Sequence, residues 1–418
     1  MKVCVIGLGY IGLPTACILA LNGHDVIGID MNKAVGDMIN KGLLQIKEVE
    51  LEKTLCNLIS QKKIIAKTEV ESADAFIICV PTPLDENFSC NLNYLTNAVK
   101  SILPVIVSGN MIIIESTVPP RTIEDTMKPL VESTGFDIGK DIYLAYCPER
   151  VLPGNIMEEM VYNDRIVGGT TNECSTIVSN FYKSFIKGNI FITDTKTAEM
   201  AKLVENIYRD VNIALANQLS ILCNKLSINS LEVFRLANKH PRVNLLSPGP
   251  GVGGHCLPVD PYFILENKNK ASNIIALSRK INDNMPNYIT SLVKKIICKL
   301  PTPKVSIWGI AYKGNTDDIR NSPSIQLINI LKENNCDLLI YDPVVRDNSL
   351  KSKEESLKDS NLLIILTDHD EFKNIDPELI LNTMRNPIIL DTKNIVDSIY
   401  FMLNGIIVYN FGNFHLIN

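Results

Sequence analysis

Short runs of apolar, β-branched residues alternate with helical patterns in the first part of the chain. The opening run at 2–6 leads through a glycine-rich segment into helix-compatible residues, and a second run ends on Asp30. Further strand-like runs lie at 75–80, 111–115 and 142–147. Continuous apolar strands that alternate with helices are typical of a parallel sheet covered on both faces. We therefore predict a doubly wound α/β domain over residues 1–196.

A long helical pattern follows, from Thr197 to about Lys225. Its apolar positions recur at helical spacing: Met200, Leu203, Val204, Ile207, Val211, Ala214, Leu215 and Leu219. Lys202, Asn206 and Arg209 are three or four residues apart and share a polar stripe. Such a stripe is usually a solvated face, so it carries no function by itself. We predict a central helical domain over residues 197–300.

The α/β rhythm then starts again. Strand-like runs lie at 304–311, 337–341, 361–367, 388–391 and 406–409. They predict a second, smaller sheet domain of the same type over residues 301–418. The predicted fold class is therefore α/β, with two doubly wound parallel-sheet domains joined by a long central helix. A chain of 418 residues is long enough for two or three domains with substantial cores.

The glycine-rich segment between the first strand and helix has the spacing of a dinucleotide fingerprint. Gly7, Gly9 and Gly12, with Tyr10 and Ile11 between them, connect strand to helix, and the next strand ends on Asp30. The glycines allow a pyrophosphate to approach the helix N-terminus. Asp30 can accept hydrogen bonds from ribose hydroxyls, and no arginine follows directly. The pattern predicts a Rossmann-like domain that binds NAD rather than NADP, although the positive charge of Lys33 weakens this preference.

Charge and composition exclude several classes of protein. The formal net charge is -5 and no basic run is present, so nothing predicts nucleic-acid binding. Eleven cysteines without a CxxC pair suit a reducing compartment, and five histidines show no metal-ligand spacing. The apolar stretch 3–21 resembles a membrane helix, but its glycines, Pro14 and the immediate return to a strand oppose that reading. We expect a cytoplasmic protein without a metal or a membrane partner.

The segment 249–260 places a single cysteine, Cys256, on a glycine-rich loop. Gly251 and Gly253 let the backbone approach a ligand closely, and Asp260 follows four residues after the thiol. A nucleophilic thiol beside a carboxylate is one interpretation. The alternative is a tight turn that buries a small hydrophobic side chain, since free cysteine often packs in a core.

Other polar side chains follow the predicted strands. They occupy the loops Pro81-Thr82, Ser116-Thr117 and Glu149-Arg150. Ligands of open α/β sheets bind beyond the carboxyl ends of the strands, so these loops are expected to line a cleft for cofactor and substrate. Lys313 and Arg320 lie on a strand-to-helix turn where cations could meet phosphate. The alternative there is a capped helix start, with Ser322 before Pro323.

Seven ordered motifs resemble one family over the whole chain: GLGYIGLP, ESTVPPRT, YCPERVLPGN, EMAKLVENIYRDVNIALANQ, NKHPRVN, GPGVGGHCLPVDP and GIAYKGNTDDIRNSP. In this order they look like the UDP-glucose/GDP-mannose dehydrogenase family. ERVLPGN, HPRVN and GPGVGGHC are more similar to the branch that oxidises UDP-N-acetyl-D-mannosamine than to the UDP-glucose enzymes. The UDP-glucose enzymes usually carry a lysine before the loop aspartate, where this chain has Val259.

The resemblance implies an NAD-dependent, four-electron oxidation of the sugar C6 alcohol to a carboxylate. Cys256 would form a thiohemiacetal and then a thioester. Lys202 and Asn206 would stabilise oxyanions, Asp260 would orient or activate water, and Thr117 and Glu149 would take part in proton transfer.

The resemblance also assigns binding residues. Cofactor contacts fall on Gly7, Gly9, Tyr10, Ile11, Gly12, Asp30, Lys33, Pro81, Thr82, Thr117 and Arg320. Contacts to the UDP-sugar fall on Arg150, Val151, Lys202, Asn206, Arg209, Gly251, Gly253, Tyr312 and Lys313. His240 and Arg242 would enter from a neighbouring subunit of a homodimer or higher homo-oligomer, because the central helices form the dimer in this family.

Other functions stay open at this point. UDP-GlcNAc, UDP-GalNAc or UDP-glucose could replace UDP-N-acetyl-D-mannosamine as the substrate. A two-electron alcohol dehydrogenase would need no thiol nucleophile, and a nucleotide sensor would keep the fingerprint without chemistry. The number of NADH molecules formed per sugar distinguishes the three classes: two, one or none.

Overall fold

The computed structural model describes residues 1–44, 50–151, 154–265, 272–298, 300, 302–334 and 336–417. Leu152 and Pro153 of the ERVLPGN motif lie outside these ranges. The chain divides into two compact units. Unit 1 comprises Met1–Glu205 and Tyr262–Asn267, and unit 2 comprises Asn206–Pro261 and Lys268–Asn418.

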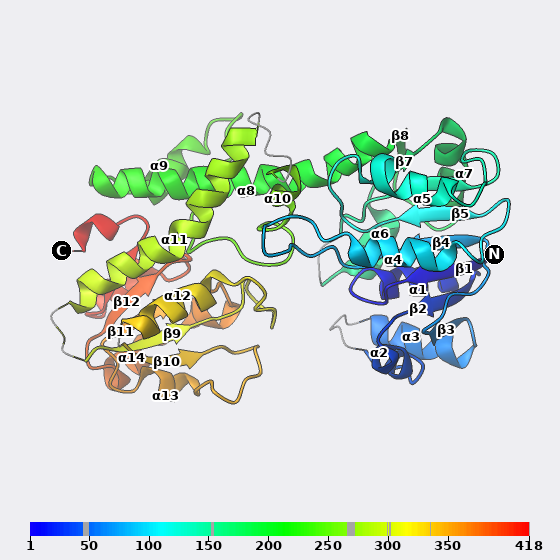
Figure 1. The fold of residues 1–418 in the computed structure, drawn as a ribbon. Coiled ribbons are helices and arrows are strands. Elements are labelled where there is room, and N and C mark those ends of the chain that lie inside the picture. The colour runs from blue at the N-terminus through cyan, green and yellow to red at the C-terminus, as the bar shows by residue number, and fades with distance from the viewer. Residues whose placement is uncertain are drawn as a thin grey trace. The chain divides into compact units, whose positions relative to one another are not determined.

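Unit 1 is built on one eight-stranded sheet (Figure 1). The strands are β1 (Lys2–Ile6), β2 (Asp25–Ile29), β3 (Ile64–Lys67), β4 (Ala75–Ile78), β5 (Met111–Ile114), β6 (Tyr143–Tyr146), β7 (Arg165–Gly169) and β8 (Ile190–Asp194). Their order is β3-β2-β1-β4-β5-β6-β7-β8. The order reverses between β1 and β4, and nucleotides bind at such a switch point in doubly wound sheets.

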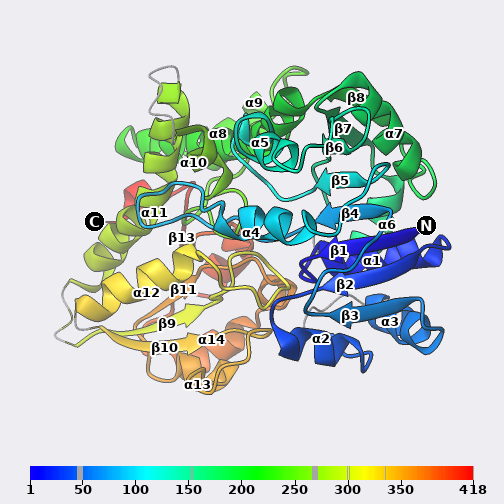
Figure 2. The same cartoon turned by 45° about the vertical axis from the view of Figure 1, so that its right-hand side comes forward.

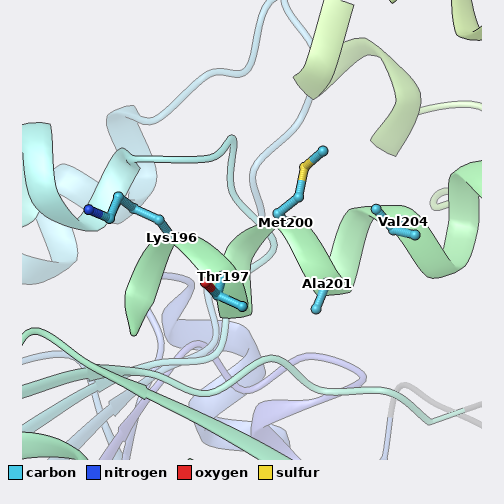
Figure 3. A pocket seen from close by; sticks show the side chains of 5 residues that line it. All are labelled: Lys196, Thr197, Met200, Ala201 and Val204. Atoms are coloured by element: carbon cyan, nitrogen blue, oxygen red, sulfur yellow. The ribbon is translucent and has the colours of Figure 1, made fainter. Parts of the chain in front are cut away.

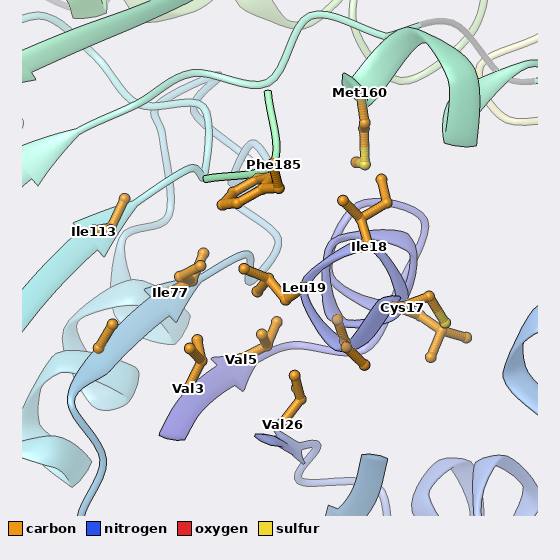
Figure 4. Close-up of a cluster of buried hydrophobic side chains, with 14 of the residues drawn as sticks. Val3, Val5, Cys17, Ile18, Leu19, Val26, Ile77, Ile113, Met160 and Phe185 are labelled. Carbon is orange, nitrogen blue, oxygen red and sulfur yellow. The ribbon is translucent and has the colours of Figure 1, made fainter. Parts of the chain in front are cut away.

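The helices of unit 1 cover both faces of this sheet. They are α1 (Gly12–Leu21), α2 (Lys33–Ile39), α3 (Leu51–Ser60), α4 (Asn93–Ile102), η1 (Ile123–Met127), α5 (Lys128–Glu132), α6 (Ile156–Tyr162) and α7 (Asn172–Tyr182). One face packs against α1, α3, α6 and α7, and the other against α4, η1 and α5. Figure 4 shows the first of these layers, where Val3 and Val5 of β1 meet Leu19 of α1. Burial on both faces explains why these strands read as continuous apolar runs.

Unit 2 contains a second sheet of five parallel strands, seen with its helices in Figure 2. The strands are β9 (Lys304–Trp308), β10 (Asp337–Tyr341), β11 (Leu362–Ile365), β12 (Ile388–Asp391) and β13 (Ile407–Asn410). Their order is β10-β9-β11-β12-β13, which is the other common doubly wound arrangement. The helices after β9 are α12 (Pro323–Glu333), α13 (Lys353–Leu357), η3 (Asp370–Asn374), α14 (Pro377–Thr383), α15 (Ser398–Leu403) and η4 (Phe414–Leu416).

Helical segments precede the second sheet in the chain. They are α8 (Thr195–Lys225), α9 (Ser230–Ala237), α10 (Asp260–Leu265) and α11 (Asn273–Ile297). The apolar side of α11 packs with α12 on one face of the second sheet, through residues such as Ile289, Val293 and Leu331. None of the helices in the described ranges is long and apolar enough to cross a membrane.

The predicted fold class is confirmed, with one difference in strand direction. β7 pairs antiparallel with β6 and parallel with β8, so the first sheet is mixed rather than parallel throughout. The sequence did not predict β3, β7 or β8. β7 ends in Gly168-Gly169, residues that disfavour strands, and β8 exposes Phe191 and Ile192 instead of alternating buried and exposed positions.

Candidate nucleotide-binding and catalytic sites

The glycine turn after β1 has the shape that a dinucleotide requires. Gly7 has a φ of 93°, and a Cβ there would lie 2.8 Å from the carbonyl oxygen of Cys79. A Cβ on Gly12 would lie 1.8 Å from the carbonyl oxygen of Gly7. A Cβ on Gly9 would meet no atom within 4 Å. Two glycines are therefore needed for packing, while Gly9 leaves its backbone open to a phosphate.

Asp30 lies beside this turn, as the sequence predicted. Its Oδ2 accepts a hydrogen bond from the N–H of Leu8 (3.1 Å), and its Oδ1 accepts one from Asn32 (2.9 Å). No side chain caps the N-terminus of α1, and no acidic residue lies in its first turn. Lys33, three residues after Asp30, begins α2. These residues fit NAD, because an open backbone and helix dipole face the pyrophosphate position while a fixed carboxylate marks the ribose.

The loops after β4 and β5 are joined. Thr82 donates a hydrogen bond from Oγ1 to the carbonyl oxygen of Thr117 (2.6 Å), and Ser116 donates from Oγ to Val80 (2.7 Å). The structure thus brings Pro81, Thr82 and Thr117 together at the carboxyl edge of the sheet. Parallel strands end at this edge, which is where the sequence placed the cleft.

Glu149 belongs to a buried ionic cluster that was not predicted from the sequence. Its carboxylate pairs closely with Arg165 at the start of β7, and its Oε1 accepts the N–H of Arg150 (2.7 Å). Arg165 also lies 3.7 Å from Glu115, and Tyr182 donates to Glu115 (2.6 Å). In the sequence, the signal for this cluster was Arg165, a charged residue at the start of the apolar run RIVGG.

Burial controls the charges of this cluster. It raises the pKa of Glu115, although Arg165 and the hydrogen bond from Tyr182 act in the opposite direction. The pKa of the Arg165 guanidinium is also raised, because attraction to Glu149 and Glu115 outweighs its loss of hydration. Arg165 therefore keeps its charge and fixes the carboxylate of Glu149 in one orientation.

Helix α8 carries the predicted polar stripe. Lys202 and Asn206 lie one turn apart on this helix. In unit 2, Asn206 donates from Nδ2 to Asp260 Oδ2 and accepts from Arg209. Both Asn206 and Asp260 are buried. The structure thus brings three of the predicted residues into one hydrogen-bonded group, with the carboxylate held by an amide.

The cysteine loop meets the predicted strand-to-helix turn within unit 2. A Cβ on Gly253 would lie 2.6 Å from Cβ of Tyr312, and one on Gly251 would lie 2.9 Å from Pro323. Cys256 is partly exposed, and its carbonyl oxygen accepts the N–H of Asp260 (2.8 Å). Two motifs some sixty residues apart therefore form one surface, and glycine is required where they touch.

The remaining predicted residues lie in various surroundings. Arg150 pairs with Glu205 (2.8 Å) in unit 1, with Val151 partly buried beside it in the chain. In unit 2, Lys313 is exposed and Arg320 pairs with Asp318 (2.6 Å). His240 and Arg242 are exposed on a loop that Asn238 closes through hydrogen bonds to both backbone groups of Leu245.

A shallow hollow on α8 lies apart from this chemistry. It is lined by Lys196, Thr197, Met200, Ala201 and Val204 (Figure 3). At 3.6 residues per turn these positions fall on the side of the helix opposite to Lys202 and Asn206. The hollow therefore does not include these two predicted catalytic residues.

The doubly wound sheets and the open glycine turn define a class of protein, one that binds a dinucleotide. The chain matches the UDP-glucose/GDP-mannose dehydrogenase family in three parts: the NAD binding domain over 1–186, the central domain over 196–284 and the UDP binding domain over 306–398. The chain belongs to this family. The predicted family, enzyme class and NAD cofactor are therefore confirmed.

Named relatives extend over the whole chain. It is 46% identical to the UDP-N-acetyl-D-mannosamine dehydrogenase of Methanococcus maripaludis, over 99% of this chain and 97% of the relative. It is 38% identical to the NDP-N-acetyl-D-galactosaminuronic acid dehydrogenase of Ralstonia nicotianae, over 94% and 95%. The structure of a UDP-N-acetyl-mannosamine dehydrogenase from Staphylococcus aureus matches with a TM-score of 0.93 and 44% identity, covering 100% of both chains.

Proposed function

We propose that this chain oxidises the C6 alcohol of UDP-N-acetyl-D-mannosamine to the carboxylate and reduces two NAD in succession. The observation that carries the proposal is the placement of Cys256 on a glycine loop that ends at Asp260, itself hydrogen-bonded to Asn206. A simple alcohol dehydrogenase has no use for a held thiol. A four-electron oxidation can use one, because addition of the thiolate to the aldehyde gives a thiohemiacetal that can donate the second hydride.

Each step balances with residues of this chain. NAD, when bound, supplies the hydride acceptor for both oxidations. A base takes the C6 hydroxyl proton in the first oxidation, and the Cys256 thiolate then adds to the aldehyde carbon to form a thiohemiacetal. The second oxidation leaves a thioester. Water attacks its carbonyl carbon, the C–S bond breaks, and the thiolate and the carboxylic acid are released. The sum is one alcohol, two NAD and one water giving one carboxylate, two NADH and three protons.

We assign roles from the contacts within each unit. In unit 1, Gly7, Gly9, Gly12 and Asp30 hold NAD, and Thr117 and Glu149 handle protons. Lys202, at the unit boundary on α8, supplies a positive charge for the developing alkoxide. In unit 2, Asn206 donates to an oxyanion, and Asp260 orients the attacking water. Arg209, Tyr312 and Lys313 are assigned to the UDP-sugar, as are Arg150 and Val151 of unit 1.

The identity of the acetamido sugar is the most specific part of the proposal. Support comes from the relatives at 46% and 44% identity, which are named for UDP-N-acetyl-D-mannosamine, and from Val259 in place of the lysine that UDP-glucose enzymes usually carry. The relative at 38% identity is named for another acetamido sugar, N-acetyl-D-galactosaminuronic acid, so the C2 and C4 configurations need a direct test.

We also propose that the chain acts as a homodimer or a higher homo-oligomer. Tyr208, Leu215 and Leu222 of α8 are exposed by 56%, 45% and 47%, and their seven-residue spacing places them on one side of the helix. An exposed apolar stripe of this kind suits a second copy of the same helix. His240 and Arg242, exposed on their loop, would then be available to a partner subunit.

The proposed location is the cytoplasm. All eleven cysteines are free thiols, including two that are exposed, Cys56 and Cys298. Free exposed thiols persist in a reducing compartment. The same compartment holds the NAD on which the reaction depends.

A side-by-side assay tests the substrate. UDP-ManNAc, UDP-GlcNAc, UDP-GalNAc, UDP-glucose and GDP-mannose are each supplied with NAD, and NADH formation is followed by absorbance. The proposal expects the highest kcat/KM with UDP-ManNAc. A higher value with another sugar would replace the substrate, and no NADH with any sugar would indicate a non-catalytic sensor.

A further inference from the structure

The cysteine loop of unit 2 is held by side-chain amides at its start, middle and end. Asn206, already described, holds Asp260 at the end. The other two amides belong to Asn217 on α8 and to Asn321 in the turn before α12. Neither was among the residues expected to act in the reaction.

Asn217 holds the start of the loop. Its Oδ1 accepts the N–H of Gly249 (2.9 Å), and both groups are buried. Gly249 lies between Pro248 and Pro250, which have no N–H, so it has the only backbone donor of that triplet. A buried backbone N–H must be paired, and Asn217 is the group that pairs it.

A buried network fixes the orientation of Asn217. Its Nδ2 donates to Asn282 Oδ1 on α11 (2.9 Å), and Asn282 in turn donates to Asp210 Oδ1 (2.8 Å). Arg279 donates to the same carboxylate (2.5 Å). Asn282 can only donate to Asp210 with its amide in this orientation, which leaves its oxygen to receive Asn217. The Oδ1 of Asn217 is therefore directed at Gly249.

Asn321 holds the middle of the loop, two residues before the thiol. Its Nδ2 donates to the carbonyl oxygen of Gly254 (3.0 Å), while the Gly254 N–H donates to the carbonyl oxygen of Arg320 (2.9 Å). Asn321 has a φ of 49° and Gly254 a φ of 94°, both in the left-handed region. Asparagine tolerates that conformation better than most other non-glycine residues, so one residue supplies both the left-handed backbone and the amide that donates to Gly254.

Asn206 and Asn217 are eleven residues apart on α8, so three turns of helix bring them back to within about 20° of the same side. One rigid side of α8 therefore sets the distance between the two ends of the loop. Asn321 fixes the bend between them from a different element.

We propose that Asn217 and Asn321 are positioning residues for Cys256: they fix the loop so that the thiol sulfur meets the aldehyde carbon, without touching the substrate themselves. This inference rests on the proposed role of Cys256. An enzyme of this kind reacts faster when the nucleophile is held at the correct distance and angle to the carbon that it attacks, and a small displacement of the nucleophile lowers the rate steeply.

Two variants and a matched control test the proposal. Asn217→Ala removes the Gly249 partner. Asn321→Gly removes the second amide but keeps the left-handed backbone, which glycine adopts readily. The control is Asn224→Ala. Asn224 also lies on α8 and donates to a side chain of α11, the hydroxyl of Tyr288 (2.7 Å), but it has no part in the loop.

We expect kcat to fall by about 10- to 100-fold in Asn217→Ala and Asn321→Gly, with KM for NAD within about twofold of the original protein. Asn224→Ala should keep kcat within about twofold while lowering the melting temperature as Asn217→Ala does. Hydrogen–deuterium exchange should show faster uptake in peptides spanning 249–256 for the two loop variants, and unchanged uptake there for the control.

The proposal is overturned if the loop variants turn over at the original rate, or if Asn224→Ala loses as much activity as Asn217→Ala. Faster exchange with an unchanged kcat would also overturn it, because the loop would be anchored without positioning the thiol. Exchange needs no substrate. If the original protein oxidised none of the sugars, the proposed function would fall, while the exchange data would still decide whether these amides hold the loop.

Discussion

The reactivity assigned to Cys256 depends on a few atoms of its own loop. The sulfur belongs to a partly exposed residue, whereas Cys4, Cys17 and Cys147 lie in the core, where burial raises their pKa values. Thiolate, not thiol, is the nucleophile, so buried cysteines of this chain are inert by comparison.

Cys256→Ser should abolish full turnover and leave NAD affinity unchanged. A serine hydroxyl is a poor nucleophile without a dedicated base, and the glycine turn belongs to unit 1. Steady-state NADH formation and a calorimetric NAD titration measure the two effects. Cys298→Ser, at an exposed thiol in the same unit, is the control and should retain full activity. Carboxylate formation by Cys256→Ser at the original rate would exclude covalent catalysis.

Asp30→Ala should weaken NAD binding by about 1–3 kcal/mol, since the ribose hydroxyls lose their acceptor. Discrimination against NADP should fall in parallel. Asp25→Ala is the matched control: Asp25 begins β2, whereas Asp30 directly follows the other end of this strand, and the Asp25 carboxylate pairs with Lys63. Equal NAD affinities for Asp30→Ala and the original protein would remove Asp30 from the ribose site.

At the scale of single residues, the sequence predicted the positions at which the spacing of glycines and acidic residues determines the local backbone conformation. The turn at Gly7 and its contact with Asp30 follow from a short-range pattern. The sequence did not predict the roles of Arg165, Glu115 and Asn217, because their partners are distant in the chain. Glu115 and Tyr182 are 67 residues apart, and Gly249 and Asn217 are 32 residues apart. No local period encodes such pairs.

Among the elements, α8 combines the most functions. Near its start, Glu199 holds the loop after β5, because its carboxylate accepts the N–H groups of Arg121 (2.5 Å) and Ile123 (2.8 Å). Burial raises the pKa of Glu199 to about 7, although these two hydrogen bonds lower it. Ionisation of this carboxyl therefore opposes folding.

The consequence is a pH-dependent stability. Because the folded pKa lies above the ordinary value of 4.5, the contribution of Glu199 is complete below about pH 4.5 and is lost as pH rises through 7. The loss amounts to about 3 kcal/mol. Glu199→Gln cannot ionise at this position, so the variant should not lose this stability as the pH rises. The free energy of unfolding of the variant, relative to that of the original protein, should therefore increase by this amount between pH 4.5 and 8.

Denaturant unfolding at several pH values measures this difference. Glu52→Gln, at an exposed position in the first turn of α3, is the control and should follow the original protein at every pH. A difference between Glu199→Gln and the original protein that stayed constant from pH 4.5 to 8 would contradict the assignment.

Element prediction succeeded where periodicity was long or burial complete. The expected helix 197–225 appears as α8, and the runs at 25–29 and 337–341 appear as β2 and β10. β8 was missed because its apolar residues face solvent on the strand at the edge of the sheet. The antiparallel pairing of β6 with β7 depends on a reversal of the chain direction that no residue pattern predicts.

At the scale of the whole molecule, the proposed oligomer makes a prediction about shared sites. If Arg242 reaches the UDP-sugar of a partner subunit, Arg242→Ala and Cys256→Ser should each be inactive alone, yet their co-expressed mixture should regain activity. A mixed dimer contains one site with both changes and one with neither. A charge-assisted contact to phosphate or sugar positions the reacting carbon, so its loss is costly.

Tagging the two variants differently allows the mixed dimer to be purified and assayed. Arg346→Ala, on another part of unit 2, replaces Arg242→Ala in the control mixture. An inactive but demonstrably mixed Arg242→Ala and Cys256→Ser dimer would place Arg242 in the site of its own subunit or outside any site.

The central claim is that one thiol carries the sugar through two oxidations before release. Its most direct test is the stoichiometry of the reaction run to completion with limiting UDP-ManNAc and excess NAD, with NADH measured by absorbance and the sugar product by mass spectrometry. The account predicts two NADH per sugar and a product that has lost the two C6 methylene hydrogens and gained one oxygen. One NADH per sugar, with an aldehyde as the final product, would contradict it.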